Sequence, residues 1–148
     1  MIEFECSSEH NVDVEILRKN AFSMNGVNFE LSPLVRMTSP RCYSDMSILE
    51  WPRNQHVFTS VLLLFSAIPV DYHKFIFVAL EQDGFEERSS TLMNKEWFHK
   101  RTIIASGEAS LVVDKVSYQS RLPFVGLLMK PLYKFIFERR HKRLGGKY

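Results

Sequence analysis

The chain has 148 residues, of which 45% are hydrophobic and 13% aromatic, so we expect a single domain over residues 1–148 with a substantial buried core. The formal net charge of +2 excludes a strong overall field for nucleic acid, and two cysteines are too few for a disulfide framework. We expect both thiols, Cys6 and Cys42, to be reduced, as in a cytoplasmic protein. Residues 1–10 contain acidic residues where an export signal has basic ones, so we do not expect them to be an export signal. The longest apolar run, 57–70, is shorter than the roughly 20 residues that a helix needs to cross a bilayer.

The first predicted elements are a strand and one or two short helices. Alternating apolar and polar residues over 2–7 predict a half-buried strand. Acidic residues at the start of an apolar segment, with Asn11 as a possible cap, predict a short helix that reaches residue 22 and is stopped by Asn25-Gly26. Residues 27–34 fit either a second short helix or a turn.

From residue 35 to about residue 119, the sequence predicts one strand after another. The β-branched and aromatic runs are separated by turn signals at Pro69-Val70-Asp71, Asp83-Gly84, Asn94-Lys95 and Ser106-Gly107. These turns recur at hairpin spacing without a helical crossover, so we expect an antiparallel sheet. Residues 40–56 match no element that we can assign.

The C-terminal segment changes to helical spacing. Apolar residues between 124 and 136 predict a long helix, which Pro131 either starts or kinks and Gly145-Gly146 ends. A curved sheet covered by a single apolar helix does not easily fill its inner volume. This α+β order therefore favours a pocket between the helix and the sheet.

Five segments, spread over nearly the whole chain, follow one another in an informative order. They are GVNFELSPLVRMT at 26–38, GFEERSS at 84–90, WFHKRT at 97–102, VVDKVSY at 112–118 and LYKFIFERRHKRL at 132–144. In this order they resemble small bacterial members of the START-domain-like superfamily, also called SRPBCC. The resemblance implies a helix-grip fold, in which a curved antiparallel sheet wraps around a long C-terminal helix, with two short helices after the first strand and a ligand-sized cavity. It implies no particular reaction, because the superfamily includes carriers, cyclases, hydroxylase subunits and chaperone cofactors.

One hairpin decides which side chains share a face of the predicted sheet. We expect strands over 96–104 and 111–119 to pair around a turn at Gly107-Glu108, which places Arg101 opposite Asp114. Opposed residues point to the same side of a sheet, so one face mixes charged and aromatic groups. The candidate ligand-binding residues on this face are Glu87, Trp97, His99, Arg101, Asp114 and Tyr118.

Three interpretations of this face are open. If it faces the C-terminal helix, it forms a cavity wall where His99 donates or accepts a hydrogen bond and Arg101 holds a carboxylate or enolate. Alternatively, Arg101 and Asp114 form a buried structural pair without ligand contact. In the third interpretation the face is exposed and the pair contributes little, but this would turn Lys100 towards the core, which is costly.

The predicted function is the binding of a small hydrophobic or amphipathic ligand, lipid-like or polyketide-like, in the cavity. An alternative is a cyclase or dehydratase of the polyketide type that uses His99 and Arg101 for acid–base chemistry. The sequence contains no nucleophile motif and no phosphate-binding loop, and its histidines lack metal-ligand spacing. We therefore expect neither a cofactor nor a metal.

Basic residues are concentrated at the end of the chain. Residues 130–148 contain seven Lys or Arg residues and one Glu. The segment can be a helix whose aromatic side grips the sheet, or residues 134–147 can contact an anionic membrane or a partner protein. Burial of the apolar residues would favour the first interpretation and their exposure the second; these residues are Leu127, Leu128, Phe135 and Phe137. We expect no nucleic acid partner, because the basic patch is one short segment.

Overall fold

A curved antiparallel sheet and one long helix form the framework of the computed structural model, which describes the backbone of residues 1–147 and the side chains of residues 1–144. Within this described part, the sheet has seven strands in the order β1-β7-β6-β5-β4-β3-β2. All paired strands are antiparallel, as the sequence predicts. The strands are β1 (Ile2–His10), β2 (Val35–Met37), β3 (His56–Leu64), β4 (Ile68–Glu81), β5 (Gly84–Thr91), β6 (Asn94–Ser106) and β7 (Ala109–Ser120).

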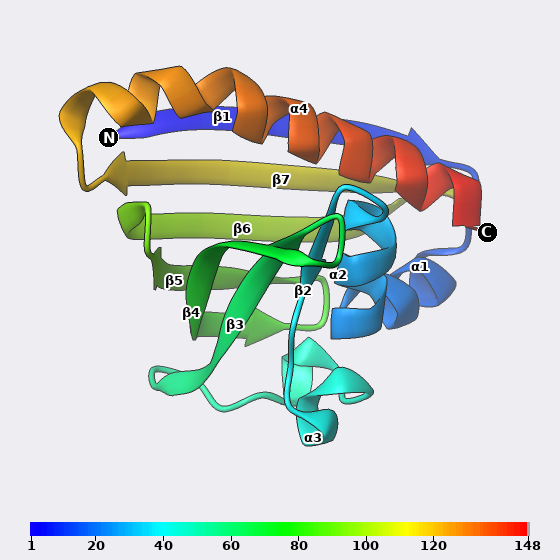
Figure 1. The fold of residues 1–148 in the computed structure, drawn as a ribbon. Helices are drawn as coiled ribbons and strands as arrows, with labels where there is room; N and C mark the ends of the chain where they lie inside the picture. The colour runs from blue at the N-terminus through cyan, green and yellow to red at the C-terminus, as the bar shows by residue number, and fades with distance from the viewer. Residues whose placement is uncertain (148) are drawn as a thin grey trace.

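The helices occupy three places in the chain. Helices α1 (Val14–Ala21) and α2 (Met24–Leu31) follow β1, as the sequence predicts. Helix α3 (Arg41–Ser44) and the 3-10 helix η1 (Ile48–Glu50) lie between β2 and β3. Helix α4 (Pro123–Lys147) runs along β1 and β7 and contacts α2 (Figure 1).

The cap of the first short helix differs from the one that we expected. The Asp13 carboxylate, not Asn11, caps α1 by accepting hydrogen bonds from the first free N–H groups. Ser23 caps α2 in the same way, through the N–H of Gly26 at 3.0 Å. Gly26 therefore lies inside α2 and does not stop α1, so this prediction was wrong. A Cβ atom at Gly26 would lie 1.9 Å from the Asn20 carbonyl oxygen, and glycine therefore permits the close approach of the two helices.

The turns before β4, β5 and β6 lie one to several residues earlier than we expected. The β3–β4 turn is at residues 65–67, where Phe65 and Ser66 adopt positive φ angles of 51° and 61°. Pro69 lies within β4, and the next two turns are at 82–83 and 92–93. The proline signal misplaced the β3–β4 turn because Phe65 and Ser66 adopt the left-handed conformation there. The predicted turn at Gly107 is correct, and this glycine has a φ of +64°.

Residues 40–56, which the sequence left unassigned, contribute to the core. They contain α3 and η1, and they place Trp51 against the sheet with 3% of its surface exposed. The Trp51 ring meets Phe58, Phe75 and Phe77 edge to face, at centroid distances of 5.3, 5.9 and 5.4 Å. The segment therefore belongs to the aromatic core of the sheet.

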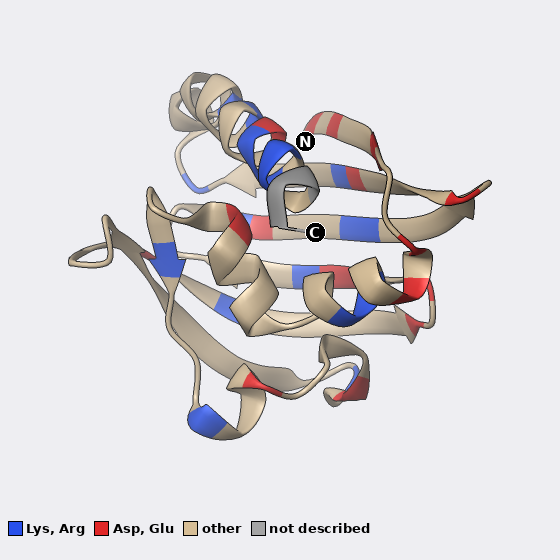
Figure 2. Ribbon diagram, turned by 90° about the vertical axis from the view of Figure 1, so that its right-hand side faces the viewer, with Lys and Arg blue, Asp and Glu red and all other residues tan. Residues whose placement is uncertain are grey.

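Helix α4 is longer than the sequence predicts. It begins at Pro123, contains Pro131 in its interior and continues through Gly145-Gly146 to Lys147, so the predicted glycine stop was wrong. Phe137 is buried on its inner side and meets Phe4 of β1 at 5.4 Å. Charged residues lie mainly on the C-terminal half of α4 (Figure 2). No helix in the described part of the chain is both long and apolar enough to cross a membrane.

Candidate functional site

The pairing of β6 with β7 has the predicted register. Arg101 lies opposite Asp114, and Trp97 lies opposite Tyr118. The side chains of Arg101 and Asp114 are both 0% exposed, and they contact groups from α2 and α4. The face is therefore the inner face of the sheet, and the solvent-exposed interpretation was wrong.

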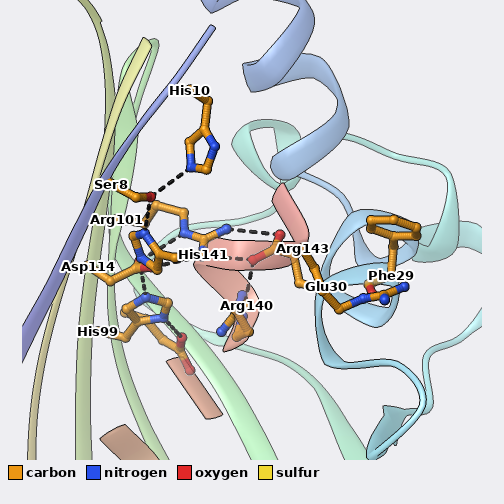
Figure 3. Close-up of polar contacts among 11 residues, drawn as sticks. Ser8, His10, Phe29, Glu30, His99, Arg101, Asp114, Arg140, His141 and Arg143 are labelled. Carbon is orange, nitrogen blue, oxygen red and sulfur yellow. Dashed lines mark hydrogen bonds and ion pairs between the residues drawn. The ribbon is translucent and has the colours of Figure 1, made fainter. Parts of the chain in front are cut away.

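Two carboxylates surround the guanidinium of Arg101 (Figure 3). Its Nε and Nη2 atoms donate to the two carboxylate oxygens of Asp114, each at 2.8 Å, and Nη1 donates to Glu30 Oε2 at 3.0 Å. Arg140 of α4 donates to the other oxygen of Glu30 at 3.1 Å. Burial by itself lowers the pKa of Arg101, but the charges of Asp114 and Glu30 outweigh it and raise the pKa above its usual value. The guanidinium therefore stays charged, and it links β6, β7 and α2.

Asp114 also receives hydrogen bonds from two histidines. His99 Nε2 lies 2.7 Å from its Oδ1 atom, and His141 Nε2 of α4 lies 2.7 Å from its Oδ2 atom (Figure 3). Burial alone raises the pKa of Asp114, but the charge of Arg101 and then that of His99 lower it well below its usual value. Because an ionised carboxylate only accepts hydrogen bonds, both histidines carry a proton on Nε2.

A third buried carboxylate, Glu87, lies between two histidines. It is hydrogen-bonded to His73 Nε2, and its Oε2 atom lies 3.7 Å from His99 Nδ1. Burial raises the pKa of Glu87, but the charge and hydrogen bond of His73, followed by those of His99, lower it below its usual value. His99 thus connects Glu87 with Asp114 along the inner face of the sheet.

At its other end, the polar network reaches β1. Ser8 Oγ is hydrogen-bonded to His141 Nδ1 and lies 2.7 Å from His10 Nε2. Burial, then the charges of His141 and Arg101, lower the pKa of His10. A chain of imidazole, carboxylate and hydroxyl groups therefore runs from His73 to His10.

A cavity of about 130 Å³ lies between α4 and the inner face of the sheet. Most of its lining is apolar, including Leu62, Phe75 and Ile136. Its size is close to that of an apolar cavity of roughly 150 Å³ that takes up benzene. The polar side chains in its lining are Asp71, His73, Glu87, Thr91, Asn94, His99, Tyr133 and Arg140.

Residues 8–148 match a family described as a domain of unknown function, DUF8410. The chain belongs to this family. No curated protein matches the chain.

Solved structures that are only 7% to 14% identical in sequence to this chain share its fold. A START superfamily protein from Mycobacterium smegmatis has a TM-score of 0.64 and 11% identity, with 98% of this chain and 95% of that chain covered. Ara h 8.0201 has a TM-score of 0.59 and 14% identity, covering 97% of each chain. The protein CV1439 from Chromobacterium violaceum has a TM-score of 0.68 and 7% identity, covering 98% and 96%. These similarities, with the curved sheet and the C-terminal helix, confirm the predicted helix-grip fold of the START-like superfamily.

The DUF8410 structure divides the six predicted site residues into two groups. Glu87, Trp97 and His99 line the cavity, whereas Arg101, Asp114 and Tyr118 do not. Arg101 and Asp114 bond to each other and to neighbouring side chains, which agrees with the interpretation of a buried structural pair. The Tyr118 hydroxyl donates to the Gly126 carbonyl of α4 at 2.7 Å, and burial, followed by the nearby Tyr133, raises its pKa to about 12. Tyr118 therefore anchors α4.

Several residues of the site were not predicted. His73 shares the strand parity of the buried Phe75 and Phe77, so alternation along β4 was a usable signal for it. Arg140 lies one helical turn after the buried Phe137, and helical periodicity could have placed it inward. The sequence offered no comparable signal for Glu30, a buried charge at the end of a short helix.

A larger hollow lies on the outer face of the sheet and differs in chemistry. It measures about 670 Å³, and charged side chains such as Glu5, Arg88 and Lys115 line it. Within the described residues, no group of three or more His, Cys, Asp or Glu side chains is arranged to hold a metal ion. The cavity beneath α4 is therefore our candidate ligand site.

Proposed function

We propose that residues 1–148 form one START-like domain that binds a small hydrophobic or amphipathic ligand beneath α4. The observation that supports this proposal is a largely apolar cavity whose lining also contains buried polar groups. His73, Glu87 and His99 contribute these groups from the sheet and Arg140 contributes one from α4, whereas Trp97 adds aromatic surface. A lipid-like or polyketide-like molecule has both an apolar body and a polar head group, and such a lining can accommodate both.

The polar groups in the cavity lining favour a ligand whose head group accepts hydrogen bonds. Arg140 lines the cavity, and its guanidinium lies 4.9 Å from the centre of the Phe137 ring while Nε bonds to Glu30. His99 lines the cavity from β6, with its Nε2 atom bonded to Asp114. A carbonyl or carboxylate head group can pair with the Arg140 guanidinium while the apolar body of the ligand contacts the aromatic side chains.

The cavity volume limits the occupant. About 130 Å³ accommodates a small ring or a short acyl segment, so a longer ligand requires an outward movement of α4. The α4 residues at the cavity are Tyr133, Ile136, Phe137 and Arg140. These four side chains would therefore move when a larger ligand enters.

Two alternatives receive less support. A cyclase or dehydratase would have to rely on His73, Glu87 and His99, because Arg101 does not line the cavity. Docking through the basic residues 134–147 competes with internal contacts, since Arg140 bonds to Glu30 and Arg143 donates to the Phe29 carbonyl at 2.8 Å.

Both cysteines are free, which supports our proposal of a cytoplasmic location.

Native mass spectrometry of the protein purified from its own cells, followed by organic extraction, tests ligand binding directly. We expect a bound mass that leaves on denaturation. We also expect the empty protein to take up fluorescent fatty acids or polyaromatic probes. An empty protein that takes up none of these probes would contradict the proposal.

A cavity-filling variant connects the measured binding with this site. Ile136→Phe adds volume at the cavity lining, and we expect it to weaken probe binding at least about tenfold, because a ring replaces space that the probe needs. Ile16→Phe is the matched control, because Ile16 is 52% exposed on α1. Equal probe affinities for the two variants would place the binding site elsewhere.

A further inference from the structure

The first half of α4 turns large apolar side chains towards the solvent. Phe124 is 82% exposed, Leu128 is 76% exposed and Phe135 is 53% exposed. We call this set the apolar ridge; its members are Leu122, Phe124, Leu127, Leu128, Leu132 and Phe135. Four residues were to distinguish the two interpretations of the basic segment. The buried Phe137 agrees with a helix that grips the sheet, whereas the exposed Leu127, Leu128 and Phe135 agree with a docking surface.

Helical geometry places the ridge on one side of α4. Phe124, Leu128 and Phe135 recur at intervals of four and seven residues, which superimpose on the same face of a helix. The opposite side is buried against the protein through Gly126 and Phe137. The ridge is therefore a continuous surface that the fold of this chain leaves uncovered, and contiguous patches of this kind mark interaction sites.

The charges along the ridge are mainly positive. Residues 121–137 contain Arg121, Lys130 and Lys134 and no Asp or Glu, and the exposed Glu138 follows one helical turn after Lys134. Lys130 and Lys134 are both exposed, and they flank the ridge on α4. Arg121 donates to the carbonyl oxygen of Leu92 at 3.0 Å, which places the half-exposed Leu92 beside the start of α4. The surface thus combines apolar side chains with a cationic border.

We propose that the apolar ridge docks on an anionic lipid bilayer, with α4 lying in the plane of the membrane surface. An exposed apolar helix face inserts at the boundary between head groups and acyl chains, and adjacent lysines attract anionic head groups. The lysines supply the charge complementarity that selects this partner. Docking of this kind requires no membrane-spanning helix.

A second copy of the chain fits the ridge less well. A two-fold interface brings the same patch of both copies together. Lys130 and Lys134 of each copy would then enter one interface, where Glu138 is the single acid of residues 121–144. An anionic surface satisfies both lysines, whereas self-association offers them one carboxylate per copy.

Binding of the full chain to lipid vesicles tests the proposal. We expect the protein to co-sediment at low salt with phosphatidylcholine vesicles that contain phosphatidylserine, and to bind vesicles of phosphatidylcholine alone at least about tenfold more weakly. High salt should reduce the binding to the anionic vesicles, because it screens the lysines. Failure of the protein to bind anionic vesicles at low salt would overturn the proposal.

Two variants separate the apolar and the electrostatic contributions. Phe124→Ser with Leu128→Ser should lower vesicle binding at least about tenfold with an unchanged melting temperature, because both side chains lie in solvent. Lys130→Glu with Lys134→Glu should abolish the preference for phosphatidylserine. Phe65→Ser is the matched control, because Phe65 is 61% exposed at the β3–β4 turn, and this variant should bind as the wild type does.

Two further outcomes would overturn membrane docking by the apolar ridge. Vesicle binding that the double serine variant leaves unchanged would overturn membrane docking by the ridge. A dimer in light scattering that the same variant dissociates would assign the ridge to self-association and would also overturn the proposal. Membrane docking is independent of the ligand, so Ile136→Phe should still bind vesicles even though it fills the cavity.

Discussion

Arg101 and Asp114 face each other across the β6–β7 hairpin, completely enclosed, and two hydrogen bonds of 2.8 Å join the guanidinium to the carboxylate. Each partner also belongs to a second contact. Arg101 reaches Glu30 of α2, and Asp114 reaches His141 of α4. The pair is therefore the point at which the sheet, the short helices and the long helix are held together by charge.

Removal of the Asp114 charge should strongly destabilise the protein. We expect Asp114→Asn to lower the free energy of unfolding by about 3–5 kcal/mol, because Arg101 would be left with an incompletely compensated buried charge. Urea unfolding measures this change. Glu86→Gln is the control, since Glu86 pairs with Lys100 at 3.2 Å on the surface and should cost less than about 1 kcal/mol. Similar losses for the two variants would refute a special role for the buried pair.

The buried carboxylates should make the protein sensitive to acid. The pKa values of Asp114 and Glu87 in the folded protein lie below the ordinary values of 3.8 and 4.5. When the pH falls below the ordinary values, these two carboxylates therefore bind protons in the unfolded chain but not yet in the folded chain. The stabilisation is fully present above the ordinary values and is lost as the pH falls towards the folded pKa values. We expect urea midpoints to fall between about pH 5 and about pH 3. The fall should be shallower for Asp114→Asn, and a flat wild-type profile in this range would contradict the prediction.

Trp51 should be essential to the aromatic core although its segment matched no element. Trp51→Ala removes four edge-to-face contacts, with Tyr43, Phe58, Phe75 and Phe77, and leaves a cavity, so we expect the free energy of unfolding to fall by about 3–5 kcal/mol. Thermal or chemical unfolding followed by circular dichroism provides the measurement. Phe65→Ala removes an exposed ring and should change stability by less than about 0.5 kcal/mol. A loss at Trp51 as small as that at Phe65 would show that residues 40–56 do not stabilise the core.

Gly84 should tolerate no side chain, because β6 approaches it closely. A Cβ atom there would lie 2.0 Å from the carbonyl oxygen of Arg101, and this backbone cannot rotate away. We expect Gly84→Ala to cost about 1–3 kcal/mol or more and to disturb β6, the strand that carries Arg101. Gly107→Ala is a useful comparison, since its Cβ would meet no atom within 4 Å and only the positive φ of 64° opposes it. Its cost should be about 1 kcal/mol, and a larger loss at Gly107 than at Gly84 would contradict this account.

Local patterns were informative where neighbouring residues decide the structure. Alternation and a glycine turn placed Arg101 opposite Asp114 correctly, because a tight hairpin determines its own register. The same reasoning misplaced the turn before β4, because Phe65 and Ser66 adopt a conformation that their residue types rarely take. Periodicity located α4 but could not determine which apolar residues it buries.

The sequence by itself determined the antiparallel pairing of consecutive strands, the long C-terminal helix and the shared face of Trp97, His99 and Arg101. These features depend on alternation, helical spacing and turns, which act over a few residues. Only the tertiary structure decided that Glu30, 71 residues before Arg101, binds its guanidinium, and that Arg140, 110 residues after Glu30, binds the same carboxylate. It also decided that the apolar ridge stays outside, because the sheet can cover only one side of α4.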